Sequence, residues 1–366
     1  MASTLRSSFW LLILVGAPAF AQPTDPPAPW SIQVGGYLQP QLRLRQSSPV
    51  QYDQDGFRLA RVRPTLHAET RLGDLTLSAH LEAELQPAFE LQDAFLTASL
   101  PLPGRGGIAI DAGQLRVPIS RQQLLSDSRL SFVDKAQLAL RHPAGVSLAP
   151  RRDLGARATL IVPEVPQVAI TVGAFDGEGP NQVENINESL FYAGRLELTP
   201  IGKATLAESA FGATFVTLAA SVGRNELATE TVTYLGADLA GSWKGLSGSV
   251  EYLRADHDGT TAGAIDYLGQ GWVAQLAYLL PVGLPPVERA RLEIAARVEE
   301  IDRNDTTPIA QPGDPEQSVR EYTACLSYYL RAHSVKVQLA LSRFDELEDR
   351  TYANDQLLLQ LTYRLE

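Results

Sequence analysis

Apolar and polar side chains alternate with a period of two residues in segment after segment of this chain. After Ser31, for example, Ile32 and Val34 fall on one face of an extended chain and Gln33 on the other, and residues 335–342 repeat the pattern near the far end. A period of two is typical of a β-strand whose faces meet different surroundings. The sequence therefore predicts an all-β protein.

About sixteen segments show this alternation, each close to the length of about ten residues that a tilted membrane-crossing strand needs. The pattern is weakest in 106–117 and 209–222, which are candidates for β-bulges. The expected strands are 32–45, 57–69, 74–86, 91–100, 106–117, 152–162, 167–175, 189–199, 209–222, 231–243, 246–257, 264–280, 288–301, 317–330, 332–344 and 355–366.

The two faces differ too strongly for a soluble barrel. One face is aliphatic, whereas the other carries Arg, Glu, Gln, Ser and Thr in numbers that no packed core could pair. Buried charges without partners are too costly for such an interior. We therefore expect a transmembrane antiparallel β-barrel whose aliphatic face meets lipid and whose charged face lines a water-filled lumen. Aromatic residues near segment ends, such as Trp243 and Tyr322, are candidates for the girdles at the membrane interfaces.

The connections between these segments alternate between short and long. Outer-membrane barrels have short periplasmic turns on one rim and long outer loops on the other, so this parity predicts a location in the bacterial outer membrane. The longest connection, 118–151, is too long for an ordinary link and is expected to be functional. We expect it to be the third outer loop, folded into the lumen as a constriction. The other long connections are 46–56, 176–188, 302–316 and 345–354.

The first residues read as an export signal. Arg6 precedes an apolar run from Phe9 to Val15, and Ala19-Phe20-Ala21 has the A-x-A form of a cleavage site. The expected organisation is a signal peptide over 1–21, a proline-rich linker over 22–30 and the barrel over 31–366. Cys325 is the single cysteine, so the chain has no internal disulfide.

Several classes of function are disfavoured. The net charge of −11 argues against nucleic acid as a partner. The sequence contains no G-x-S-x-G, no H-E-x-x-H and no P-loop, and its five histidines lack metal-ligand spacing. We therefore expect no enzymatic activity, no cofactor and no metal site.

Arginine is the residue type that gives the lumen a chemistry. Its guanidinium group stays charged and binds oxyanions through two parallel hydrogen bonds, and rings of arginine select anions in pores. The alternative, which the sequence leaves open, is that each arginine pairs with a carboxylate such as Glu82 or Glu84 and stiffens the wall. The candidate anion-binding residues that line the pore are Arg43, Arg61, Arg63, Arg116, Arg121, Arg129 and Arg157.

A series of motifs, in this order, resembles the phosphate-selective porin O and P family. The resemblance covers nearly the whole chain after the signal peptide and is carried by order and spacing. It implies a sixteen-stranded outer-membrane porin, usually a trimer, with its third outer loop inside and with an arginine ladder and a lysine cluster that guide phosphate or polyphosphate. The motifs are Gly56–Arg63, Leu91–Phe95, Gly113–Ser120, Leu125-Ser126, Phe132–Lys135, Ala174–Gly179, Ala193–Leu196 and Gly271–Gln275.

The chain departs from that family in two respects. It has only four lysines, Lys135, Lys203, Lys244 and Lys336, and it ends in Glu366 rather than in an aromatic residue. The predicted function is passive diffusion of small anions, with phosphate and polyphosphate as candidate solutes. The alternatives are a general or sugar-acid porin and a non-conducting structural barrel. The expected partners are outer-membrane lipid and further copies of the chain in a homotrimer.

Overall fold

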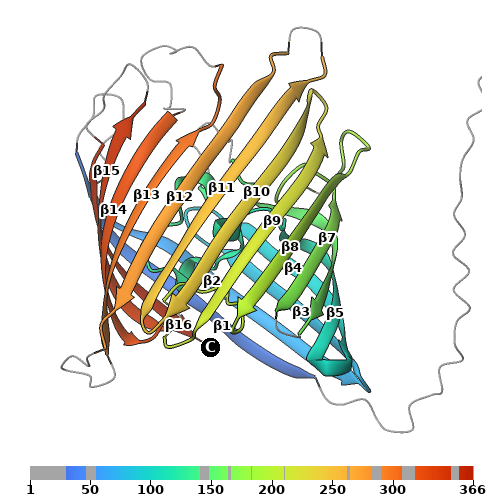
Figure 1. Cartoon of the computed structure of the whole chain (residues 1–366), viewed down its shortest axis with the longest axis horizontal. Helices are drawn as coiled ribbons and strands as arrows, with labels where there is room; N and C mark the ends of the chain where they lie inside the picture. The colour runs from blue at the N-terminus through green and yellow to red at the C-terminus, as the bar shows by residue number, and fades with distance from the viewer. Residues whose placement is uncertain are drawn as a thin grey trace, which may run out of the picture.

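The computed structural model describes residues 30–46, 55–140, 148–163, 166–182, 184–209, 211–261, 264–281, 290–306, 318–347 and 354–365. The expected signal peptide and residues 22–29 of the expected linker lie outside this described part. Within it, sixteen strands form one closed antiparallel barrel (Figure 1). The predicted fold class and number of strands are confirmed.

Each strand pairs with its neighbours in the sequence, and β16 pairs with β1, with Tyr37 opposite Arg364. Closure leaves no strand edge with unpaired backbone groups, which a lipid environment requires. The strands are β1 Ser31–Arg45, β2 Gly56–Leu72, β3 Leu75–Glu84, β4 Glu90–Leu102, β5 Gly106–Arg116, β6 Arg152–Val162, β7 Gln167–Phe175, β8 Phe191–Ile201, β9 Phe215–Glu226, β10 Glu230–Trp243, β11 Leu246–Gly259, β12 Tyr267–Leu279, β13 Arg291–Asp302, β14 Ser318–Arg331, β15 Val335–Glu346 and β16 Gln356–Leu365.

The helical elements within the described residues are all short. Three of them, α1 Arg121–Leu124, η2 Asp127–Arg129 and η3 Gln137–Ala139, lie in the connection between β5 and β6. The fourth, η1 Pro103–Arg105, joins β4 to β5. Among the described residues, no helix is both long and apolar enough to cross a membrane.

The outer face of the barrel is apolar, as predicted. Side chains that point outward, such as Leu96 and Leu341, are 65% and 56% exposed, whereas Gln360 and Thr362, which point inward from β16, are fully buried. An exposed aliphatic face of this extent is stable when lipid rather than water covers it. The alternation in sequence therefore marks the two sides of the wall correctly.

The inner face differs from the expectation in one region. Some inward-pointing residues are apolar and buried rather than polar and wetted. They belong to an apolar cluster and include Val232, Leu253 and Val273. The expectation of a polar inner face throughout is wrong here, because the connection between β5 and β6 covers these positions with its own apolar residues. The same cluster includes Ile301 and Val319 of the wall and Val117, Ile119, Leu138 and Ala149 of the connection.

Two local expectations are also corrected. The strand expected over 209–222 begins only at Phe215 and runs to Glu226, because the preceding residues leave the wall. The bulge expected in 106–117 is absent, since β5 pairs with both neighbours without a register shift. Near β9 the register shift falls in its pairing with β8, between Leu198 and Ile201.

Candidate functional site

The connection between β5 and β6 crosses the lumen. Its described residues, 117–140 and 148–151, reach the wall on the far side. The backbone N–H of Gln122 donates to Glu251 of β11 at 2.8 Å, and Gln338 of β15 donates to the carbonyl of Ser131 at 3.0 Å. Its short helices are visible inside the ring of strands (Figure 1). These contacts place the described residues of the connection inside the barrel, and we call residues 117–140 and 148–151 the infolded loop.

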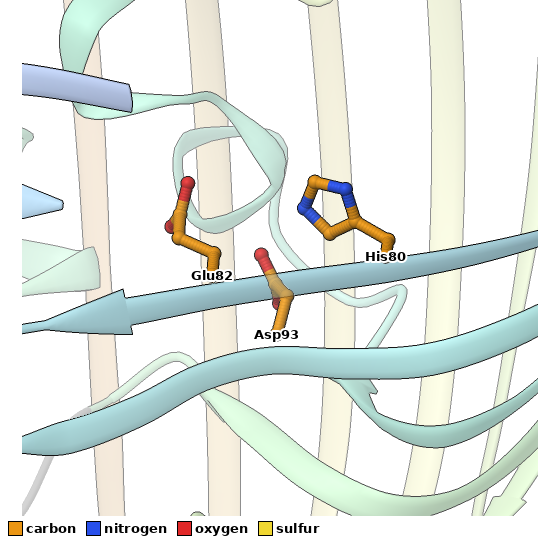
Figure 2. Close-up of side chains that lie close together, drawn as sticks. All are labelled: His80, Glu82 and Asp93. Atoms are coloured by element: carbon orange, nitrogen blue, oxygen red, sulfur yellow. The ribbon is translucent and has the colours of Figure 1, made fainter. Parts of the chain in front are cut away.

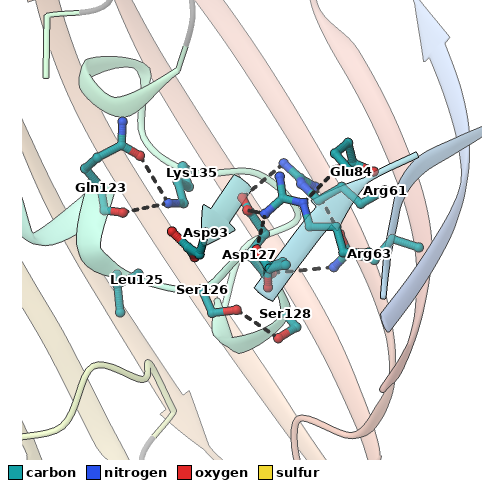
Figure 3. Close-up of polar contacts among 12 residues, drawn as sticks. Arg61, Arg63, Glu84, Asp93, Gln123, Leu125, Ser126, Asp127, Ser128 and Lys135 are labelled. Atoms are coloured by element: carbon teal, nitrogen blue, oxygen red, sulfur yellow. Dashed lines mark hydrogen bonds and ion pairs between the residues drawn. The ribbon is translucent and has the colours of Figure 1, made fainter. Parts of the chain in front are cut away.

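Asp127 fastens the infolded loop to β2. Its carboxylate lies 2.8 Å from the Arg63 guanidinium and 3.2 Å from that of Arg61 (Figure 3). The Arg61 guanidinium also lies 3.1 Å from Asp134. Burial alone would raise the pKa of the Asp127 carboxyl, but Arg61, Lys135 and Arg63 outweigh it and hold that pKa well below its usual range. Asp127 is therefore a carboxylate, and it neutralises part of the charge of both arginines.

A second group of charges lies where β3, β4 and β6 face the loop. Arg152 holds Asp93 with two hydrogen bonds, at 2.7 and 3.2 Å, and lies 3.6 Å from Glu82. Arg116 lies 3.5 Å from Asp93 and donates to the carbonyl of Leu124 at 2.6 Å. Arg116 thus joins the wall to the infolded loop.

The predicted arginines have different surroundings. Arg61, Arg63 and Arg116 come together around Asp127 and Asp93, and each pairs with a carboxylate, as the wall-pairing alternative describes.

The other four predicted arginines are more dispersed. Arg157 pairs with Asp111 at 2.7 Å. Arg121 is buried and donates to the carbonyl of Thr205 at 2.9 Å, and Arg43 lies near the end of β1, partly exposed. Arg129 lies in η2 of the infolded loop, beside a cavity.

That cavity, of about 420 Å³, separates the infolded loop from the wall formed by β1 to β6. A second cavity of about 500 Å³ lies along β2 to β6 near the rim with the short turns. Both lie on the same side of the lumen. The charged residues that line the first cavity are Arg116, Arg129, Arg157, Arg364, Glu82 and Asp93, beside His80.

Three residues of this region are absent from the candidate site residues chosen from the sequence: Arg364, Arg152 and His80. The alternation of the last strand already turns Arg364 inward, but only closure, which places β16 beside β1, brings it to this cavity. Arg152 follows directly after the infolded loop, and its pairing with Asp93 depends on the register across β4, β5 and β6.

The side chains of His80, Glu82 and Asp93 form a possible ligand set for a metal. One ligand atom from each lies within 4.8 Å of the others, and Figure 2 shows the three side chains grouped on adjacent strands. The carboxylates are already engaged by guanidinium groups, because Arg152 contacts both. A divalent cation would have to displace those charges, so the donor set fits a cation poorly.

No protein-family model and no curated protein sequence matches this chain. Solved structures do match. The outer-membrane channel DcaP of Acinetobacter baumannii is 14% identical, with a TM-score of 0.59 over 92% of this chain and 97% of that one. An anion-selective porin from Comamonas acidovorans is 12% identical, with a TM-score of 0.58 over 92% and 99%. The trimer form of OmpT, an outer-membrane protein of Vibrio cholerae, is 11% identical, with a TM-score of 0.57 over 92% and 99%.

At these identities the comparisons show the fold. Together with the exposed aliphatic face, the closed sixteen-stranded wall defines the class as a bacterial outer-membrane β-barrel. Within that class, the barrel has the architecture of the porins. The O and P family remains a resemblance of sequence motifs.

Proposed function

We propose that this protein is an outer-membrane porin through which small anions diffuse passively, along the side of the lumen lined by β1 to β6. The observation that carries the proposal is the charge of the 420 Å³ cavity. Four guanidinium groups line it, from Arg116, Arg129, Arg157 and Arg364, against the two carboxylates of Glu82 and Asp93.

An excess of positive charge in a narrow passage attracts small anions and repels cations. Passage also requires that an anion leave again, so binding has to be weak. The pairing of Arg116 with Asp93 and of Arg157 with Asp111 moderates the field in this way. The alternatives of an anion path and a paired wall are therefore compatible in this lumen.

The finer parts of the proposal have separate support. The motif resemblance favours phosphate and polyphosphate as solutes, and the similarity to an anion-selective porin favours anions in general. The similarity to a trimeric outer-membrane protein favours a homotrimer. Because the sequence contains none of the catalytic motifs considered above, we propose transport rather than catalysis.

The test is the reversal potential of the purified protein in a planar bilayer under a potassium chloride gradient. We expect a reversal potential whose sign indicates anion selectivity. We expect its magnitude to be smaller in an Arg129→Gln/Arg364→Gln variant. Arg254→Gln is the matched control, because Arg254 points outward and pairs with Asp256. A cation preference in the unaltered protein would contradict the proposal. Phosphate that fails to reduce the chloride current would favour a general porin.

A non-conducting structural barrel is the second candidate. It is favoured by the apolar cluster that fills the lumen beside β10 to β14, which leaves less of the cross-section for water. Absence of conductance steps in the same bilayers, from protein that shows the heat-dependent gel mobility of a folded barrel, would support this candidate over the porin.

A further inference from the structure

The connection between β8 and β9 also turns into the lumen, from the rim opposite the infolded loop. Its described residues are 202–209 and 211–214. At its base the two ends approach so closely that a Cβ atom at Gly202 would collide with the carbonyl of Thr214. Gly202 has a φ of 69°, which glycine adopts readily. The base of the connection therefore depends on glycine.

This second connection is bound to the infolded loop. The backbone N–H of Glu208 donates to the carbonyl of Arg129 at 3.1 Å, and the backbone N–H of Ser131 donates to the Glu208 carboxylate at 2.7 Å. Arg121 donates to the carbonyl of Thr205 at 2.9 Å. Segments from opposite rims thus meet inside the barrel.

The second connection is also anchored to the wall. The Glu208 carboxylate accepts from the amide of Gln275 on β12, and the Glu208 carbonyl lies 2.6 Å from Nε2 of His333. The ring of Phe211 meets those of Tyr329 and His333 edge-on, with centroids 5.0 and 5.1 Å apart. These contacts tie the connection to β12, to β14 and to the turn that follows β14.

Its backbone conformation is unusual. Ser209 and Phe211 have φ values of 53° and 38°, a region that a bulky side chain rarely adopts. Such conformations persist where surrounding contacts impose them, and they concentrate at functional sites. The contacts of Glu208 and Phe211 supply that constraint.

We propose that residues 202–209 and 211–214 form a second constriction element, which closes the lumen beside β12 to β15 and confines anions to the cavity along β1 to β6. Leu206 of this element lines that cavity. Glu208 is the positioning residue, because its carboxylate accepts from Ser131, Gln275 and, at 3.4 Å, Gln122. Its removal leaves these donors without an acceptor inside the barrel. The inference rests on the proposed porin function.

The experiment compares single-channel conductance and the uptake of a large neutral sugar by liposomes. In Glu208→Ala we expect the conductance to rise at least about twofold and the sugar to enter, since a wider path admits larger solutes. Phe211→Ala removes an independent anchor and should act in the same direction. Glu226→Gln, in an exposed ion pair with Arg224, is the control and should match the unaltered protein.

The outcomes separate the two proposals. Unchanged conductance in both variants, with the unaltered protein conducting and all barrels folded, would refute the second constriction and leave the porin intact. If the unaltered protein did not conduct and the two variants did, the result would support the second constriction and contradict the porin proposal. If none of the folded proteins conducted, both proposals would be refuted.

Discussion

The inner wall of the barrel has two unlike sides. Along β2 to β6, inward positions hold charged residues such as Arg63, Glu82 and Arg157, and a cavity remains between the wall and the infolded loop. Along β10 to β14, equivalent positions hold Leu253 and Val273, packed against the infolded loop. Apolar positions of the packed side are covered by apolar residues of the loop, whereas a buried charge there has a hydrogen-bond partner, as Glu251 has in the backbone N–H of Gln122.

The largest loss of stability should follow the removal of an ion pair on the charged side of the lumen. Asp127→Asn keeps the shape but removes the carboxylate shared by Arg61 and Arg63. We expect a loss of about 3–5 kcal/mol in the free energy of unfolding, because two buried guanidinium groups each lose one charged partner, although Arg61 keeps Asp134 and Arg63 keeps Glu84. Urea unfolding in detergent, followed by tryptophan fluorescence, measures it. Asp256→Asn, in an outward ion pair, should lose less than about 1 kcal/mol.

The packed side should respond to lost volume instead. Leu253 is fully buried in the apolar cluster, so Leu253→Ala should cost about 2–4 kcal/mol through lost burial and a cavity. The same unfolding measurement applies. Leu235 of β10 is 47% exposed on the outer face, and Leu235→Ala is the matched control. Equal losses in the two variants would show that the loop does not pack there.

Acid should loosen the second constriction element. Burial, followed by Lys336, lowers the pKa of His333 well below its usual value, so the packed imidazole is neutral. Since its pKa is lower in the folded state, the packing weakens as pH falls below the unfolded value of about 6.5. The charged groups near His333 are Lys336, Arg129 and Arg364.

We therefore expect conductance to rise between neutral pH and about pH 5, where His333 begins to gain a proton among cations. His333→Gln cannot take up this proton and should give a flatter profile. An identical rise in that variant would assign the pH response to other groups.

The smallest effect should come from single charges in the cavity. Glu82→Gln removes one of its two lining carboxylates, so the reversal potential should move a few millivolts further to the anion side, an effect limited by salt screening. Glu321→Gln changes a carboxylate that pairs with Arg297 beside β14, away from the cavity, and should leave the potential unchanged. Equal shifts in both would mean that ions also pass on the packed side.

The wall was largely predictable from the sequence, because alternation is a local property and closure joins neighbouring segments. The packed side was less predictable from the sequence. Successive apolar residues, as at Tyr252-Leu253 and Trp272-Val273, nevertheless indicate a strand that is covered on both faces. The strand expected over 209–222 covers a segment that alternates only weakly, and no local pattern marks Phe215 as the start of the wall. Only the contacts of Glu208 and Phe211 show that the described residues before Phe215 leave the wall.

The sequence predicted that arginine lines the lumen, but it did not predict which carboxylate each arginine pairs with. The inward face identified Arg61 and Arg63 correctly as lumen residues. Their partner Asp127 is 64 positions beyond Arg63 in the chain, and no local pattern connects them. The path of the infolded loop decides which of its carboxylates the wall arginines meet and where the cavity remains.

Cys325 points inward from β14 and is 4% exposed, in a small apolar cluster with Phe132. The native thiol is thus shielded from water-soluble alkylating reagents. A cysteine introduced at a position that water reaches would therefore be the sole accessible target for such a reagent. The polypeptide is consequently suited to mapping, residue by residue, which side chains a permeating molecule meets.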